Sequence, residues 1–178
     1  MPRKGRSLSL RILKRLRSFE LPVAIWAASI EFSVMAHAKH TVTVPRPIGE
    51  VYDFLADGLN EPKWRPDVTD VHLASGSASS VGAVYAQTMK GPGGRPIKGD
   101  YRITSTEVPT RLDFEVVAGP ARPTGSFELV KLSPTSTEVS FTLDLMPKGL
   151  MKLMGGMIAK QVESEAAAIL RVPEAMGG

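Results

Sequence analysis

The stretch from Val44 to Asp67 constrains the fold more than any other part of the sequence. It begins at the end of a predicted strand, His40–Val44, in which β-branched residues alternate with others. Two prolines, Pro45 and Pro47, stop that strand, and Pro47 also suits the first turn of a helix. We therefore expect one strand, then two short helices, then many strands, which is an uncommon order.

The first short helix is predicted from the spacing of Val51, Phe54 and Leu55, which fall on one apolar face. We expect it to end at Asp57-Gly58. Gly58 is predicted to take the left-handed conformation that glycine often adopts after a helix.

A second short turn follows, and Asn60 is a suitable cap for it. It runs through Trp64 and is stopped by Pro66. We expect Trp64 to anchor this turn by packing, with a place at the wall of a cavity mouth as the alternative.

Strand-like segments separated by turn signals fill the chain from residue 68 to residue 146. The Gly91-Pro-Gly-Gly94 turn predicts a hairpin between the second and third of them. Strict alternation in the last one predicts an antiparallel sheet with one buried face. With the first strand there are seven, the others being Val68–Ala74, Val84–Lys90, Ile97–Thr106, Leu112–Val116, Gly125–Leu132 and Glu138–Met146.

A helix over residues 148–171 is predicted to cover that buried face. Pro147 precedes it and Pro173 follows it, which fits a start and a stop. Lys148 and Lys152 are interpreted as solvated side chains. Apolar residues form a stripe at helical spacing: Met151, Met154, Ile158, Val162 and Ile169.

Basic residues are concentrated at the N-terminus. Residues 1–20 carry seven Lys or Arg and one acidic residue, whereas residues 21–178 carry fifteen basic and seventeen acidic residues. The net charge of +4 therefore comes from the N-terminal segment, and the rest of the chain gives no electrostatic reason to expect nucleic acid. We expect residues 1–37 to form an extension outside the fold and residues 38–178 to form a single domain.

Three interpretations of this extension stay open. Met35 can be the natural start, which implies a cytoplasmic protein. A basic run, a short apolar run and Ala36-His37-Ala38 fit a targeting segment, which implies export or delivery to an organelle. A basic amphipathic segment can also contact a membrane or a partner, and residues 1–34 are the only place where the sequence suggests membrane contact.

The stretch from Val44 to Asp67, with the strands and the helix that follow it, resembles the START-like superfamily (SRPBCC), the polyketide cyclase/dehydrase and lipid transport group. The resemblance rests on Pro-x-Pro-x-x-x-Val-Tyr-Asp-Phe-Leu-Ala-Asp from Pro45, on Asn-x-Pro-x-Trp from Asn60, and on a later strand-rich segment closed by a helix. It covers residues 38–172. It implies an α+β helix-grip fold: a curved seven-stranded antiparallel sheet around a long C-terminal helix, two short helices after the first strand, and a cavity between sheet and helix.

Catalytic motifs are scarce in this sequence. It has no cysteine, and its three histidines, His37, His40 and His72, lack the spacing of a metal site. It has no Gly-x-Ser-x-Gly elbow, no phosphate-binding loop and no dinucleotide fingerprint. We therefore predict no metal and no cofactor.

Large residues on the inward faces are the candidates for lining a cavity, although each also fits a plain hydrophobic core. Tyr85 and Tyr101 can offer hydroxyl groups inside an apolar wall. Arg102 should point outward by alternation, unless a bulge turns it towards an anionic group. The candidate set is Tyr85, Met89, Tyr101, Ile103, Phe114, Phe127, Phe141, Met154 and Met157.

The resemblance implies three functions, and the sequence does not fix the oligomeric state. The leading hypothesis is binding of a hydrophobic small molecule such as a lipid, an isoprenoid quinone or a polyketide. The second is a cyclase or dehydratase acting on a polyketide-like substrate, with Tyr85, Tyr101 or Arg102 polarising a carbonyl. The third is a protein-interaction module of the chaperone-activator or ribosome-associated type, which should have a filled core.

Overall fold

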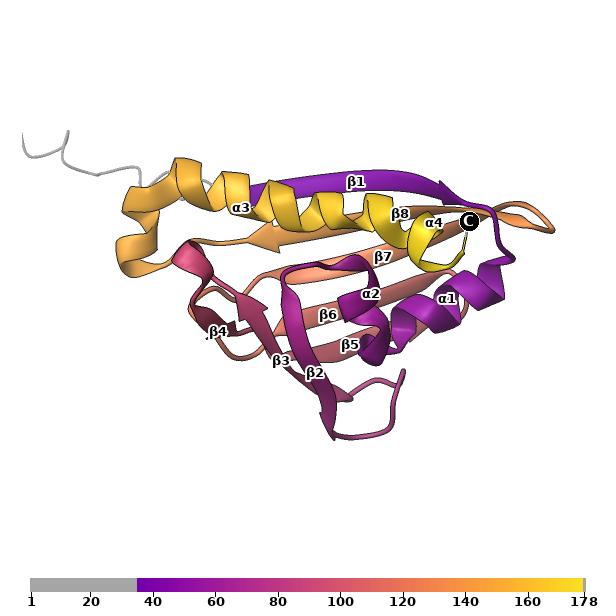
Figure 1. Ribbon diagram of the computed structural model, residues 1–178, viewed down its shortest axis with the longest axis horizontal. Helices are drawn as coiled ribbons and strands as arrows, with labels where there is room; N and C mark the ends of the chain where they lie inside the picture. The colour runs from indigo at the N-terminus through magenta and orange to yellow at the C-terminus, as the bar shows by residue number, and fades with distance from the viewer. Residues whose placement is uncertain (1–34, 178) are drawn as a thin grey trace, which may run out of the picture. The chain divides into compact units, whose positions relative to one another are not determined.

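Antiparallel strands form one curved sheet in the computed structural model, which describes residues 35–177 (Figure 1). The strand order is β1-β8-β7-β6-β5-β3-β2, and β4 pairs with β3. The bounds are Ala36–Val44 for β1, Val68–Ser75 for β2, Val84–Lys90 for β3, Pro96–Lys98 for β4, Tyr101–Glu107 for β5, Arg111–Val116 for β6, Thr124–Ser133 for β7 and Ser136–Leu145 for β8.

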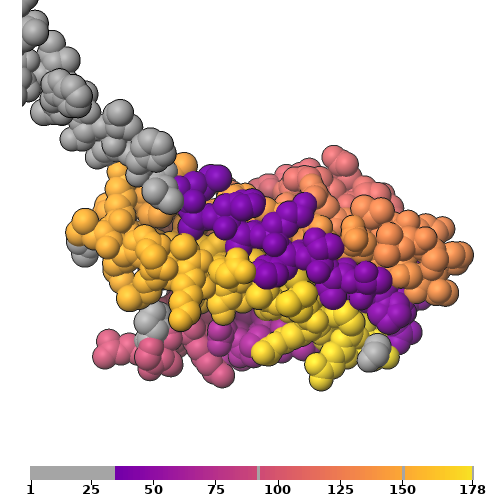
Figure 2. All heavy atoms as spheres, turned by 90° about the horizontal axis from the view of Figure 1, so that it is seen from above, coloured from indigo at the N-terminus to yellow at the C-terminus, as the bar shows by residue number. Residues whose placement is uncertain are grey.

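Helices cover one face of this sheet, and α3 runs beside β1 (Figures 1 and 2). This arrangement confirms the predicted α+β helix-grip fold with short helices after the first strand. The helical bounds are Ile48–Ala56 for α1, Gly58–Asn60 for η2, Glu61–Trp64 for α2, Pro92–Gly94 for η3, Gly149–Met154 for η4, Gly155–Ala167 for α3, Ala168–Arg171 for η5 and Val172–Ala175 for α4.

Aromatic rings hold the centre of the core together. Phe127 on β7 and Phe141 on β8 stack with their centroids 4.5 Å apart. The buried Trp64 meets both rings edge-on, at 6.1 Å and 5.9 Å. Such pairs add about 0.5–1.5 kcal/mol each beyond their buried area. Trp64 is thus a packing anchor, as the sequence predicted, and it joins α2 to the sheet.

The prediction of one long strand over Ile97–Thr106 is wrong, because the two strands β4 and β5 occupy this region. The strand is interrupted at Gly99 and Asp100. The Asp100 carboxylate accepts the Gln87 backbone N–H at 3.0 Å and so replaces a backbone acceptor in the ladder. Gly99 in turn donates its N–H to the Gln87 carbonyl at 2.9 Å. A side chain has taken over part of the strand pairing, and the sheet has eight strands instead of seven.

The C-terminal helix also differs from its prediction. It starts with the 3₁₀ segment η4 and continues beyond Pro173, which lies in the first turn of α4, where proline is tolerated. At the junction of η4 and α3, Met154 has a backbone conformation that is not helical, with φ −107° and ψ 21°, so the predicted stripe is interrupted there. Met151, Ile158 and Val162 face inward, whereas Met154 points to solvent.

Gly58 does not take the predicted left-handed conformation. Glycine is required there for a different reason, which is the close approach of two rings. A Cβ atom at Gly58 would lie 2.1 Å from the hydroxyl oxygen of Tyr101 and 2.7 Å from the ring of Tyr85. The glycine therefore lets η2 pack directly against β3 and β5.

The sheet begins slightly earlier than the sequence suggested. Ala36 and His37, which the predicted boundary assigned to the extension, pair with Leu145 and Asp144 of β8. The predictions about residues 1–34 lie outside the described residues. Among residues 35–177, none of the helices is both long and apolar enough to cross a membrane.

Candidate functional site

A cavity of about 160 Å³ lies between the sheet and α3. Its walls come mainly from β6, β8 and α3, and the loop after β6 and the β4 strand contribute to its rim. Exposed residues such as Lys98 and Pro120 belong to the lining, so the cavity meets the surface there. We call this opening the mouth. The apolar lining residues are Met89, Ile97, Phe114, Val116, Pro120, Ala121, Pro123, Phe141, Leu143, Leu145, Met151, Ile158 and Val162.

The volume sets what the cavity can enclose. It is close to the roughly 150 Å³ of an apolar cavity that holds benzene. It is smaller than the roughly 300–1,000 Å³ of a typical ligand pocket. One ring or a short alkyl segment therefore fits inside, and a longer molecule would extend through the mouth.

Polar side chains gather in one wall of the cavity, around Arg65. Helix α2 positions this residue: it is short, Pro62 lies in its first turn, and the Arg65 backbone N–H bonds the Glu61 carbonyl at 2.8 Å. The i, i+4 spacing places Arg65 and Glu61 on one side of this turn. Arg65 Nη1 lies 2.6 Å from Glu61 Oε2.

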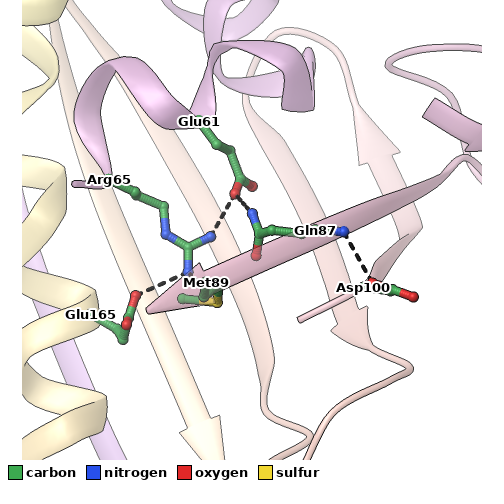
Figure 3. A network of polar contacts seen from close by, with 6 residues as sticks. All are labelled: Glu61, Arg65, Gln87, Met89, Asp100 and Glu165. Atoms are coloured by element: carbon green, nitrogen blue, oxygen red, sulfur yellow. Dashed lines mark hydrogen bonds and ion pairs between the residues drawn. The ribbon is translucent and has the colours of Figure 1, made fainter. Parts of the chain in front are cut away.

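Figure 3 shows the Arg65 guanidinium between two carboxylates that come from different helices. Its second terminal nitrogen, Nη2, lies 3.0 Å from Glu165 Oε2 on α3. The sulfur of Met89 on β3 lies 3.9 Å from the same nitrogen. All three charged side chains are largely buried, being between 10% and 14% exposed. The contact ties α2 to α3 across the end of the cavity.

Further donors complete the cluster. The Gln87 side-chain amide donates to Glu61 Oε2 (Figure 3), and the Tyr101 hydroxyl lies close enough to the Glu61 carboxylate for its charge to act on it. On α3, Gln161 donates to Glu165 Oε1 at 3.1 Å. We call Glu61, Arg65, Gln87, Tyr101 and Glu165 the polar cluster. It holds one guanidinium and two carboxylates, a formal charge of minus one.

Electrostatics keep the hydrogen-bond donors of this cluster protonated. Burial raises the pKa of Tyr101 well above 10.0, and the neighbouring Glu61 carboxylate raises it further. Burial by itself would lower the pKa of Arg65, but the carboxylates of Glu61 and Glu165 outweigh it, and the pKa of Arg65 rises above its ordinary value. Both groups therefore stay donors at physiological pH.

The structure brings together some of the residues that the sequence put forward. Met89, Tyr101, Phe114 and Phe141 line the cavity. Tyr85, Ile103 and Phe127 are buried in the core but are not part of the lining. Met154 and Met157 are wrong as lining candidates, because they lie on the outer side of the helix, 45% and 62% exposed.

Sequence reasoning missed the charged part of the site. Glu61, Arg65 and Glu165 did not stand out, although Gln87 gave a readable signal. It occupies an inward position of β3 between Tyr85 and Met89, and a polar residue in such a row points to a buried partner. Glu165 gave a similar signal, because it is a charged residue next to the inward-facing apolar positions of α3.

Two further predictions concern residues away from the cavity. Arg102 points outward as alternation predicted, and its guanidinium lies 3.3 Å from Glu115 on the exposed face. His37 Nδ1 and His40 Nε2 each form a separate hydrogen bond of 2.7 Å, with Asp144 Oδ1 and Glu163 Oε1. Within residues 35–177, His, Asp and Glu side chains do not form a group of three that could hold a metal.

The fold and the site define a helix-grip protein with an apolar cavity that ends in a charged cluster. The sequence matches the family described as polyketide cyclase / dehydrase and lipid transport over residues 35–171. The protein belongs to this family, and with it to the START-like superfamily. No curated protein matches the sequence.

Solved structures agree with this assignment at the level of the fold. The Zhui aromatase/cyclase of a Streptomyces species is 18% identical with a TM-score of 0.60, over 79% of this chain and 94% of that one. A START superfamily protein from Mycobacterium smegmatis is 15% identical with a TM-score of 0.59, over 79% and 98%. Major latex-like protein 151 from Panax ginseng is 13% identical with a TM-score of 0.53, over 75% and 97%.

Proposed function

We propose that the protein binds a hydrophobic small molecule, such as a lipid, an isoprenoid quinone or a polyketide-like compound, in the cavity between the sheet and α3. The observation that carries this proposal is the cavity itself, apolar along most of its wall and polar in one place. This combination is typical of sites that hold an apolar body and orient it by a few hydrogen bonds.

The polar cluster restricts the polar part of the ligand. The two terminal nitrogens of Arg65 already face carboxylates, and the cluster has one negative charge in excess. A carboxylate on the ligand would meet two carboxylates and one guanidinium, which is unfavourable away from water. The ligand is therefore neutral at this end and carries a hydroxyl, amide or similar group.

The size of the cavity limits the affinity. Burying about 300 Å² of apolar ligand surface, in the cavity and at its mouth together, yields roughly 7 kcal/mol. The loss of translational and rotational freedom removes several kcal/mol of this. We expect dissociation constants on the order of micromolar.

A cyclase or dehydratase is the second candidate, because Arg65, Gln87 and Tyr101 bring hydrogen-bond donors to one wall of the cavity. Their contacts with Glu61 and Glu165 leave the buried Arg65 Nε without a partner among residues 35–177. Such donors can polarise a substrate carbonyl and stabilise the charge that develops on it. The third hypothesis, an interaction module, requires a filled interior, which does not fit the cavity.

Calorimetric titration of the full chain with lipids, quinones and aromatic polyketides tests the proposal. Val116→Trp puts an indole ring into the cavity, whereas the matched control Val117→Trp changes a neighbouring half-buried valine outside the lining. We expect binding to be lost in the first variant and kept in the second. No binding by any of these compounds, or equal binding by both variants, would refute the proposal.

Turnover separates the two candidates. If a polyketide-like substrate is converted, Tyr101→Phe should abolish conversion while the variant still folds and binds. Binding without conversion of any compound in the series supports a carrier or sensor instead of an enzyme.

A further inference from the structure

The mouth of the cavity is framed by three segments that carry only positive charge. They are residues 90–98, 117–123 and 146–162, and each contributes to the cavity lining, for example through Ile97, Ala121 and Met151. Residues 35–177 contain fifteen basic and sixteen acidic residues. The three segments hold seven of the basic residues and none of the acidic ones, and all seven are exposed: Lys90, Arg95, Lys98, Arg122, Lys148, Lys152 and Lys160.

Large apolar side chains are exposed beside these charges. Leu153 is 81% exposed, Met157 62% and Met146 50%, with Met154 next to them. Neighbours along the chain face the other way: Leu145, Met151 and Ile158 line the cavity. The segment 146–162 is thus apolar on both sides, towards the cavity and towards solvent.

A surface that is both basic and apolar fits a particular partner. Single exposed apolar residues are ordinary, but a cluster at the rim of an apolar cavity indicates an interaction site. Lysines among methionine and leucine side chains match an interface in which anionic headgroups lie above acyl chains. The three segments contain no acidic residues. Anionic headgroups would therefore not be repelled there by carboxylates, as they would be elsewhere on this domain.

We propose that the mouth docks on the surface of an anionic phospholipid bilayer, with the lysines at the headgroups and Leu153, Met154 and Met157 in the outer acyl region. The sequence suggested membrane contact only through residues 1–34, and the structure assigns a second surface to it. Docking in this orientation points the cavity at the bilayer.

Docking has a consequence for ligand exchange, and this consequence rests on the proposed function. A hydrophobic molecule could pass between the bilayer and the cavity without crossing water. A molecule longer than the cavity could keep its remaining part in the acyl region, which agrees with a volume of about 160 Å³. The docking itself requires no ligand.

Flotation of the full chain with vesicles tests the docking, without any added ligand. One set of vesicles contains phosphatidylcholine alone, and the other contains phosphatidylcholine mixed with phosphatidylglycerol. We expect binding to the mixed vesicles, weakened by salt, and little binding to the neutral ones. Equal binding to both sets would overturn the proposal.

Two sets of variants locate the contact on the protein. Each lysine near an anionic surface contributes enough that neutralising three should weaken binding about a hundredfold. The test variant is Lys148→Gln, Lys152→Gln, Lys160→Gln, and its matched control is Lys39→Gln, Lys63→Gln, Lys131→Gln, with the same change in net charge outside the three segments.

Apolar variants complete the test. Leu153→Ser with Met157→Ser should weaken binding, whereas Val130→Ser with Leu132→Ser, two exposed residues on β7, should not. Circular dichroism verifies that all variants fold. If test and control variants bind alike, the contact lies outside the three segments and the proposal is wrong. It is also wrong if wild type is a dimer that Leu153→Ser dissociates, because the surface then binds a second copy.

Discussion

Removing the guanidinium from the polar cluster gives the sharpest test of how this domain is held together. Arg65→Met deletes the cation that lies between Glu61 and Glu165 and leaves two carboxylates in a largely buried place. Breaking a buried ion pair in this way costs about 3–5 kcal/mol. Because the three side chains keep slight exposure, water can relieve part of the cost, and we expect about 3 kcal/mol. For a domain of this size, that lowers the melting temperature by roughly 10 °C.

Urea unfolding followed by circular dichroism measures this loss, and two further variants interpret it. Arg102→Met removes an exposed ion pair with Glu115 and should cost less than about 1 kcal/mol. Arg65→Met combined with Glu61→Gln and Glu165→Gln removes all three charges, so it should recover most of the lost stability. The reasoning is refuted if Arg65→Met costs no more than Arg102→Met, or if the triple variant is less stable than Arg65→Met.

Two more predictions follow from the packing around Tyr101. Gly58→Ala should lower the free energy of unfolding by about 1–3 kcal/mol, because its methyl group would overlap Tyr101 and Tyr85; Gly49→Ala, where the new methyl group meets no atom within 4 Å, is the control and should not destabilise. The second prediction concerns pH: the free energy of unfolding should fall as the pH rises above 10. The pKa of Tyr101 is higher in the folded state than its value of 10.0 in an unfolded chain, so the unfolded state loses the proton first. Tyr101→Phe should show a smaller fall in denaturant unfolding series on either side of pH 10; equal slopes for wild type and variant would contradict the assignment.

Local patterns predicted most of the strands and the covering helix, and the resemblance to the START-like superfamily supplied the helix-grip arrangement. Alternation along β8 gave the buried face correctly, since Val139, Phe141, Leu143 and Leu145 are all buried. The errors arose where a tertiary contact replaced a local rule. Asp100 divides a strand because its carboxylate accepts a backbone hydrogen bond. The pattern of apolar and polar residues does not show that a side chain replaces a backbone acceptor in this way.

The site was predictable only along the strands. Successive side chains of a strand point to opposite faces of the sheet, so the inward positions can be read from the sequence. For this reason Tyr101, Phe114 and Phe141 were predicted correctly as lining residues. The face that a helical residue occupies depends on an unbroken helix, and the non-helical backbone of Met154, between η4 and α3, turns this side chain away from the cavity. The polar cluster was missed because its members come from α2, β3, β5 and α3, and only the tertiary fold brings them together.

Native mass spectrometry of the full chain, purified gently from its own host, tests the central claim most directly. The cavity-filled variant Val116→Trp is measured beside the wild type. We predict a retained adduct of a small hydrophobic molecule on the wild type and none on the variant. The same adduct on both would contradict the account, because the molecule would then be bound somewhere other than in the cavity.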